Sequence, residues 1–342
     1  MGNTTSSLTN STEPISGTSK LSPMMPIIEK PIHESENEAP VEPQKEFKSV
    51  IDSTNPGTYD DVLKDVKENN AMPYEGLKFL LNKSLSSRFQ IQHNVSLSKL
   101  QGNFYNFGAT YVGTKQISPT EMYPIFYGEM ETNGNLHARV MHHFNDYIKY
   151  RGIYQIKGSD WLNVTNSIDY FTKKSTSTFT TANMDVTDGT GVYIAQHLQR
   201  ITNNIDLGLE FIKQKPKEMP IDVNFMTFMG KYSKNNWSVV SNIAPTLKSL
   251  KLAYINKITE NLTCSTELDS DLGKGETNTT VSIRSNIPDI NTTVRGQIDS
   301  NYKVVVNVET ILMPLPFTLG LCATLNHKRK DLYNLGISFT IG

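Results

Sequence analysis

The chain has 342 residues, with 33 Lys and Arg against 34 Asp and Glu, so its formal net charge is −1 and gives no strong attraction to nucleic acid. Its mean hydropathy of −0.39 is too polar for a bundle of membrane-spanning helices. The longest apolar stretch, Ile311 to Leu325, is interrupted by Pro314 and Pro316. The length allows either two ordinary domains or one large barrel.

Residues 1–50 are rich in Ser, Thr, Pro, Glu and Asn and contain few aromatic side chains. A segment of this composition cannot bury enough apolar surface to offset the entropy of an ordered chain. We therefore predict a disordered leader over residues 1–50. Its first residues, MGNTTS, fit the myristoylation pattern, which makes Gly2 a candidate acceptor.

Residues 51–73 contain the pattern of a short amphipathic helix, predicted to run from about Asn55 to Asn70. Asn55 is suited to cap this helix, and Pro56 is suited to its first turn. Apolar side chains recur at helical spacing on one stripe, at Tyr59, Val62, Leu63 and Val66. Two interpretations are open, an ordinary helix packed on another surface or a helix packed on the inner wall of a barrel.

Residues 74–342 read as a succession of short strands in which apolar and polar residues alternate. Residues 205–211 (IDLGLEF) are a clear example. Turn-forming residues separate the strands at 133–134, 188–189, 234–236, 273–275 and 299–301. Membrane strands of about 9 to 11 residues give this region on the order of 18 to 20 strands. The residues between the apolar ones are Asn, Ser, Thr, Gln, Gly and charges, as expected for the wall of a water-filled lumen, so we predict a transmembrane β-barrel.

The last nine residues, NLGISFTIG, alternate strictly, with apolar side chains at every second position from Leu335 to Ile341. A bilayer would cover the apolar face of such a strand. The pattern polar-x-Gly-x-x-apolar-x-apolar is similar to the C-terminal signal that mitochondrial outer-membrane barrels present to their assembly machinery. The residues in this pattern are Asn334, Gly336, Phe339 and Ile341.

The sequence contains no pattern typical of a catalytic or metal site, and we predict neither an enzyme nor a cofactor. The adjacent pair His142 and His143 would point to opposite faces of a strand, so the two imidazoles could not chelate one ion. The segment from Gly273 to Gly275 is a turn rather than a phosphate-binding loop.

Alternation also predicts which charged side chains face the lumen. If Leu207 and Leu209 face lipid, Asp206 must face inward. The carboxylates placed inward by this rule are Glu129, Glu131, Asp206, Glu210, Glu267, Asp269 and Glu309. They could attract basic amphipathic segments through weak contacts. Basic residues are placed inward as well, at Arg139, Lys149, Arg151, Arg284, Arg295 and Lys303, so these charges could instead only pair across strands and solvate the lumen.

Apolar positions in the lumen are a second candidate surface for a polypeptide. By the same alternation Tyr127 and Trp161 are expected to face inward. Together with one side of the N-terminal helix, they could hold an extended hydrophobic segment.

Several long motifs resemble the pore subunit of the mitochondrial outer-membrane protein translocase, a branch of the mitochondrial porin superfamily. Residues 74–97 (YEGLKFLLNKSLSSRFQIQHNVSL) resemble its first hairpin, and residues 111–121 (YVGTKQISPTE) resemble its second-hairpin segment. Further similar segments are residues 55–58, 195–202, 313–319, 325–329 and 339–342. The resemblance runs from about residue 55 to the end of the chain.

This resemblance implies a 19-stranded barrel in the mitochondrial outer membrane, closed by a parallel pairing of residues 77–81 with residues 334–341. It also implies that the N-terminal helix lies inside the barrel. The implied function is the import of unfolded precursor proteins with basic presequences. The implied partners are these precursors, small single-helix subunits, receptor subunits and a second copy of the barrel. The competing interpretations are a metabolite or anion porin of the same membrane and a soluble secreted β protein with a binding function.

Overall fold

The computed structural model describes residues 55–100, 102–118, 121–185, 188–216, 222–314, 316–328 and 333–342. The predicted leader and Gly2 lie outside these residues. None of the helices in the described part has the length and apolar character needed to cross a bilayer.

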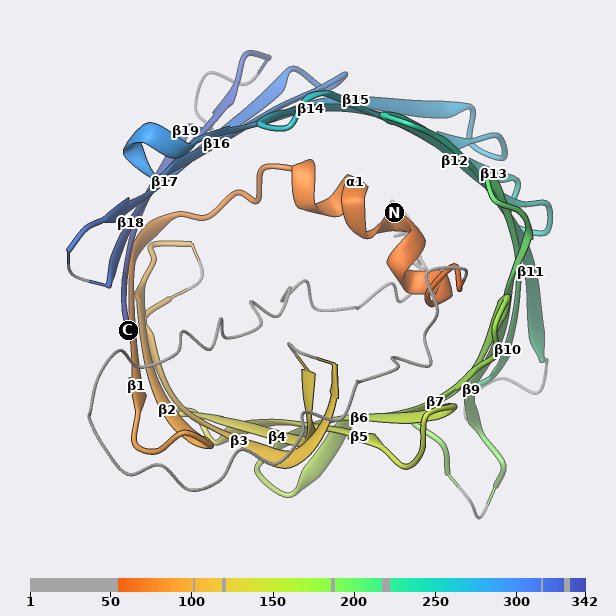
Figure 1. The fold of residues 1–342 in the computed structure, drawn as a ribbon, viewed down its shortest axis with the longest axis horizontal. Helices are drawn as coiled ribbons and strands as arrows, with labels where there is room; N and C mark the ends of the chain where they lie inside the picture. Colours follow the sequence, from red (N-terminus) through yellow and green to blue (C-terminus); the bar gives the residue numbers. More distant parts are fainter. Residues whose placement is uncertain are drawn as a thin grey trace, which may run out of the picture. The chain divides into compact units, whose positions relative to one another are not determined.

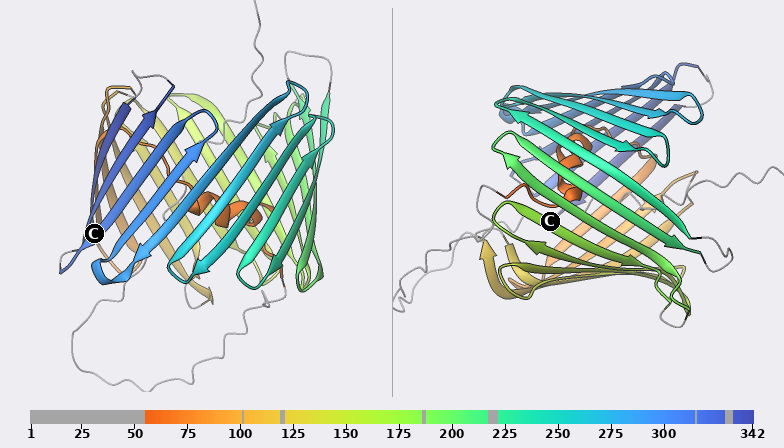
Figure 2. Two further views of the ribbon diagram at one scale, coloured as in Figure 1. Left: turned by 90° about the horizontal axis from the view of Figure 1, so that it is seen from above. Right: turned by 90° about the vertical axis from the view of Figure 1, so that its right-hand side faces the viewer.

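The described residues form 19 strands in one sheet, and consecutive strands are paired as antiparallel hairpins (Figures 1 and 2). The strands are β1 (Gly76–Ser84), β2 (Phe89–Leu97), β3 (Phe104–Ser118), β4 (Glu121–Glu131), β5 (Asn135–His143), β6 (Ile148–Lys157), β7 (Asp160–Phe171), β8 (Ser175–Ala182), β9 (Gly191–Thr202), β10 (Ile205–Lys215), β11 (Val223–Lys234), β12 (Trp237–Ala244), β13 (Ser249–Thr259), β14 (Leu262–Asp271), β15 (Glu276–Ile287), β16 (Thr292–Asp299), β17 (Lys303–Leu312), β18 (Phe317–Asn326) and β19 (Tyr333–Ile341). A short 3₁₀ turn, η2 (Pro288–Ile290), connects β15 to β16.

The sheet closes on itself because β1 pairs with β19 (Figure 1). This pairing is parallel and aligns Gly76 with Gly336 and Leu81 with Ile341. An odd number of up-and-down strands requires one parallel pair, since the first and last strands then run in the same direction. The predicted 19-stranded barrel and its parallel closure are confirmed.

The predicted turn segments lie between strands, except that those at 234–236 and 299–301 begin on the last residue of β11 and β16. Gly134 in the β4–β5 turn and Gly275 in the β14–β15 turn have φ angles of +79° and +70°. Such left-handed backbone favours glycine because a Cβ atom is crowded there. Turn residues therefore predict where these hairpins turn, while the exact number of strands followed from the family resemblance.

The N-terminal segment forms the 3₁₀ helix η1 (Tyr59–Leu63) followed by the short α-helix α1 (Lys64–Asn69). The helix is thus shorter than predicted. Asn55 and Pro56 precede it, and the capping interaction comes from Thr58, whose N–H and hydroxyl both donate to the Asp61 carboxylate at 3.0 and 2.7 Å.

Asn55, predicted as the cap, instead binds the turn between β7 and β8. Its amide Nδ2 donates to the Thr172 carbonyl at 2.6 Å, and its Oδ1 accepts from the Gly57 N–H at 2.7 Å and the Thr176 hydroxyl at 3.1 Å. These tertiary bonds satisfy the side chain better than a helix end would, which is why the local capping rule failed.

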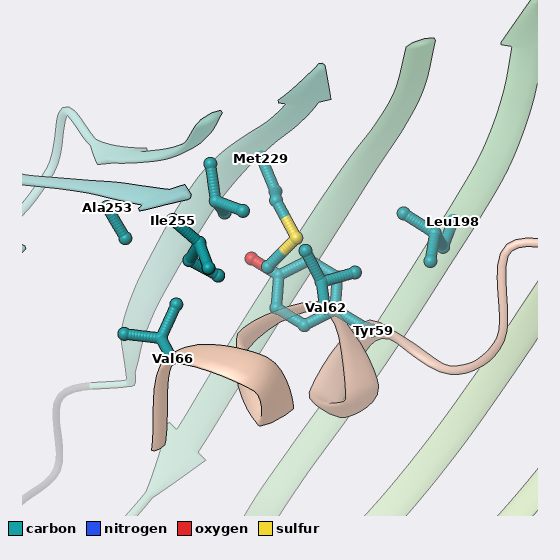
Figure 3. Close-up of a cluster of buried hydrophobic side chains, with 8 residues drawn as sticks. Tyr59, Val62, Val66, Leu198, Met229, Ala253 and Ile255 are labelled. Atoms are coloured by element: carbon teal, nitrogen blue, oxygen red, sulfur yellow. The ribbon is translucent and has the colours of Figure 1, made fainter. Parts of the chain in front are cut away.

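The apolar stripe of this segment packs against the strand wall (Figure 3). The segment contributes three buried apolar side chains, Tyr59, Val62 and Val66, and Leu63 packs beside them. Their partners on the wall are Leu198, Met229, Val240, Ala253 and Ile255, from β9 and β11 to β13. In Figure 1 the helix is drawn within the ring of strands, beside β12–β15 and away from β3–β5.

Candidate functional site

The two faces of the wall differ in chemistry. We call the face that contacts Tyr59, Val62 and Val66 the inner face, and the opposite one the outer face. On β10, Gly208 lies opposite Leu198 and below the Tyr59 ring, so the even-numbered residues of this strand belong to the inner face. The odd-numbered Leu207 is 50% exposed on the outer face. Large apolar side chains also stand exposed along the other strands, as a hydrocarbon-facing surface requires.

All seven carboxylates predicted to face inward lie on the inner face. Asp206 and Glu210 share the face of Gly208 on β10, Glu267 is paired with Ala253, and the remaining four follow through the strand registers. The basic side chains predicted to face inward lie there as well, so the inner face carries charges of both signs.

Three of the seven carboxylates are neutralised by a cation on the neighbouring strand. Asp206 is 6% exposed and accepts from Arg200 Nε at 2.7 Å and Nη2 at 3.2 Å. The other two pairs are Arg295 with Glu309 at 2.9 Å and Lys251 with Asp269 at 2.9 Å. Because the Lys251–Asp269 pair is more than half exposed, water screens it strongly.

The other four carboxylates accept hydrogen bonds from uncharged groups and form no ion pair with a described residue. Glu210 accepts from Gln196 Nε2 at 2.7 Å, and Glu267 accepts from Asn70 Nδ2 at 2.6 Å. Glu129 accepts from Asn106 Nδ2 at 2.8 Å and from the Tyr127 hydroxyl at 2.7 Å, and Glu131 accepts from Asn135.

Two of these four lie under or against the N-terminal segment. Glu267 is bound by Asn70 of that segment, while Glu210 is close enough to Tyr59 to influence its ionisation. Burial, with a smaller contribution from Glu210, holds the pKa of the Tyr59 phenol well above its ordinary value, so this side chain stays neutral at physiological pH. Glu267 therefore helps to hold the N-terminal segment as well as line the wall, whereas Glu210 contributes no hydrogen bond to the described part of that segment.

Glu129 and Glu131 lie on β4, in a different part of the wall. The contacts described for residues 55–74 reach β1, β6, β8–β15 and β17–β19. We call the inner face of β2–β5 the open arc, since it lies across the ring from α1 in Figure 1. Glu129 and Glu131 are the two predicted carboxylates on this arc.

A buried ion pair on the inner face was not singled out by the sequence. Asp169 on β7 is fully buried and accepts from Arg151 Nη2 at 3.0 Å and from the Thr178 hydroxyl at 2.8 Å. The same Arg151 nitrogen lies 3.9 Å from Asp60 of the helical segment. Alternation placed Arg151 inward, but only the β6–β7 register shows that Asp169 is its partner.

The prediction for Trp161 is wrong. A register shift between Gln155 and Ile156 places Trp161 opposite Ile156, and its ring contacts Tyr154 at 6.4 Å between centroids. Because a β-bulge inserts an extra residue, alternation changes phase across it. Trp161 therefore joins the aromatic side chains of the outer face, while Tyr127 lies on the inner face as expected.

The described residues contain no cluster of three or more His, Cys, Asp or Glu side chains that could hold a metal ion. The Tyr123 ring lies 4.7 Å from the buried His143 ring. A closed wall with paired charges on its inner face is suited to guiding a solute rather than to bond-making chemistry.

Comparison with known proteins agrees with this architecture. The family described as eukaryotic porin matches residues 55–336. The mouse and human proteins called mitochondrial import receptor subunit TOM40 homolog are each 34% identical over 289 residues, which cover 84% of this chain and 78% of the relative. The Caenorhabditis elegans protein of the same name is 33% identical over 302 residues, which cover 87% of this chain and 98% of the relative.

The matched region includes the N-terminal segment and nearly the whole wall, ending within β19. The similarity and the closed barrel are those of a channel of the mitochondrial outer membrane and not of an enzyme. The chain therefore belongs to the eukaryotic porin family, as a homologue of the TOM40 subunit.

Proposed function

We propose that this protein conducts unfolded precursor polypeptides across the mitochondrial outer membrane. The observation that carries the proposal is a closed wall whose inner face bears carboxylates, amides and cations while its outer face bears apolar side chains. The relatives named as import receptor subunits support the choice of a polypeptide as the solute. In this proposal α1 lies in the aqueous pore and narrows it.

We further propose that basic presequences bind weakly to the open arc. Glu129 and Glu131 carry charge that no described cation neutralises, and they lie across the ring from α1. In this proposal a basic segment passes along the open arc, across the ring from α1. Each exposed contact stabilises the complex by less than about 1 kcal/mol. The bound segment can therefore dissociate readily.

The proposed partners follow from the proposed import function and from the apolar outer face. Small single-helix subunits and a second barrel would contact the apolar outer face within the bilayer, and receptor subunits would deliver precursors. The relatives are named as subunits, which supports a complex rather than an isolated barrel.

Single-channel recording of the full chain in a planar bilayer tests the proposal. We expect a cation preference and concentration-dependent block by a synthetic basic presequence peptide, with no block by a control peptide whose Lys and Arg are replaced by Gln. The second candidate, a metabolite porin, predicts an anion preference and no block by either peptide. That result would refute the proposal that the protein conducts precursor polypeptides.

A further inference from the structure

The junction between β1 and β19 has fewer register pairs than its neighbours. Six residue pairs join these two strands, from Gly76–Gly336 to Leu81–Ile341. By comparison, eight pairs join β1 to β2 and nine join β18 to β19. The junction is also the parallel one, and parallel pairing is slightly less stable for each residue. We call this junction the seam. Six pairs also join β4 to β5, so the parallel pairing, rather than the count alone, distinguishes the seam from the other junctions.

The residues that connect α1 to β1 cross the inner face toward this seam. We call Asn70–Tyr74 the inner strap. Its Asn70 side chain donates to Glu267 on β14 at 2.6 Å and accepts from the Ser282 hydroxyl on β15 at 2.7 Å. Further along, the Met72 carbonyl accepts from Asn307 Nδ2 on β17 at 2.7 Å. Each step of the strap thus binds a strand nearer to the seam.

The strap ends on the seam itself. The Tyr74 N–H donates to Cys322 Sγ on β18 at 3.4 Å, and the Tyr74 hydroxyl lies 3.2 Å from Ser338 Oγ on β19. Chain continuity then carries Tyr74 into β1 at Gly76. One residue therefore connects the two strands of the seam and the strand behind them.

Two glycines make room for the Tyr74 ring. A Cβ atom on Gly336 would lie 2.5 Å from Tyr74 Cδ2, and one on Gly320 would lie 3.0 Å from the Tyr74 hydroxyl oxygen. The first distance is incompatible with a side chain, and the second would require the Tyr74 hydroxyl to move by a few tenths of an ångström. The ring also contacts Lys78 on β1, whose Nζ lies 5.2 Å from the ring centroid. The wall at the seam is shaped to receive this one aromatic side chain.

We propose that the inner strap fastens the seam from the pore side, with Tyr74 as the latch between β1 and β19. Closure of the barrel then depends on a segment that faces the conducted polypeptide, and any occupant that lifts the strap loosens the seam. The same arrangement gives Gly336 a role in the finished barrel, independent of the predicted assembly signal to which this residue belongs. The inference concerns closure alone and does not depend on the identity of the solute.

Hydrogen–deuterium exchange of the full chain in lipid nanodiscs tests this inference. For Tyr74→Ala we expect amides of β1 and β19 to exchange at least about tenfold faster, because the ring contacts and the hydroxyl bond are both lost, while β10–β12 stay unchanged. For Tyr74→Phe and for Ser338→Ala we expect an increase of about threefold to fivefold, since only the hydroxyl bond is removed. In the double variant Tyr74→Phe/Ser338→Ala, the amides of β1 and β19 should exchange no faster than in either single variant, because both changes remove the same hydrogen bond.

Tyr59 provides the matched control. It is a tyrosine of the same N-terminal segment, but it packs on β9 and β11–β13 rather than on the seam. Tyr59→Ala and Tyr59→Phe should leave exchange in β1 and β19 unchanged. Wild-type exchange at the seam in Tyr74→Ala, or equal acceleration by the Tyr59 variants, would overturn the proposal. If Tyr74→Ala fails to assemble, Tyr74→Phe and Tyr59→Phe are compared instead. Equal exchange rates at the seam in these two variants would also overturn the proposal.

Discussion

Loosening the helix from the wall gives the sharpest test of how the N-terminal segment is held. Val62 and Val66 are each 2% exposed and lie at the centre of the contact with β9 and β11–β13. Replacing each valine by Ala removes two carbon atoms from this cluster, and each buried carbon contributes about 0.8 kcal/mol of burial free energy. The double variant Val62→Ala/Val66→Ala should therefore lose about 3 kcal/mol of docking free energy, which corresponds to roughly a hundredfold shift in the equilibrium.

The isolated segment cannot compensate for this loss. α1 spans only Lys64–Asn69, far below the length at which a helix is stable in water. Hydrogen exchange of the full chain in nanodiscs should therefore show amides of residues 59–69 exchanging about a hundredfold faster, with the strands unchanged. The control Lys64→Ala/Lys67→Ala alters exposed side chains of the same helix and should change exchange less than fivefold.

Two outcomes would refute this reasoning. If residues 59–69 remain as protected as in the wild type, the polar contacts of Asn55, Asn70 and Arg151 hold the segment without the apolar cluster. If the strands lose protection together with the helix, the segment is part of the barrel's own core rather than an element docked on it.

Three further predictions concern the polar groups of the inner face. Arg200→Ala should destabilise the barrel in denaturant unfolding by about 3–5 kcal/mol, because Asp206 is left buried without its cation, and adding Asp206→Ala should restore part of this loss. Glu129→Gln/Glu131→Gln should raise the concentration of presequence peptide needed for half-block about threefold at low salt, with a smaller effect at high salt. An unchanged half-block concentration would contradict the role proposed for the open arc. Asn55→Ala should weaken the docking of the start of the N-terminal segment by about 1–3 kcal/mol. Hydrogen exchange should then become faster at residues 57–63 and stay unchanged on β13, which lies beside α1.

The faces and hairpins of the wall could be predicted because their causes are local. A side chain's face on a strand depends only on whether its position is odd or even, so the inward placement of Asp206 and Glu210 needed no knowledge of the neighbouring strand. The rule fails where the backbone departs from regular pairing. Trp161 lies beyond a bulge, and nothing in the flanking sequence indicated the extra residue that the bulge inserts.

The partners of the inward charges could not be predicted with the same tools. Alternation says that Arg151 and Asp169 share a face, whereas their contact depends on the register of β6 against β7. The Arg200–Asp206 pair could not be predicted either. The turn pairs Thr202 with Ile205, and regular pairing would then place Asp206 opposite Ile201, whereas a register shift after Ile205 places it opposite Arg200. Asn55 is a further case, since a strong local capping pattern yielded to hydrogen bonds with residues more than a hundred positions away.

The odd number of strands links these observations. In an even-stranded barrel every junction is antiparallel, and none differs in kind from the others. Nineteen strands require one parallel junction, between the two ends of the barrel that are farthest apart in sequence, so no hairpin turn helps to align it. The chain places its N-terminal segment directly before β1, where the inner strap can reach β19 without an additional element. The segment that occupies the inner face is thus also the nearest available support for the junction that the strand count makes necessary.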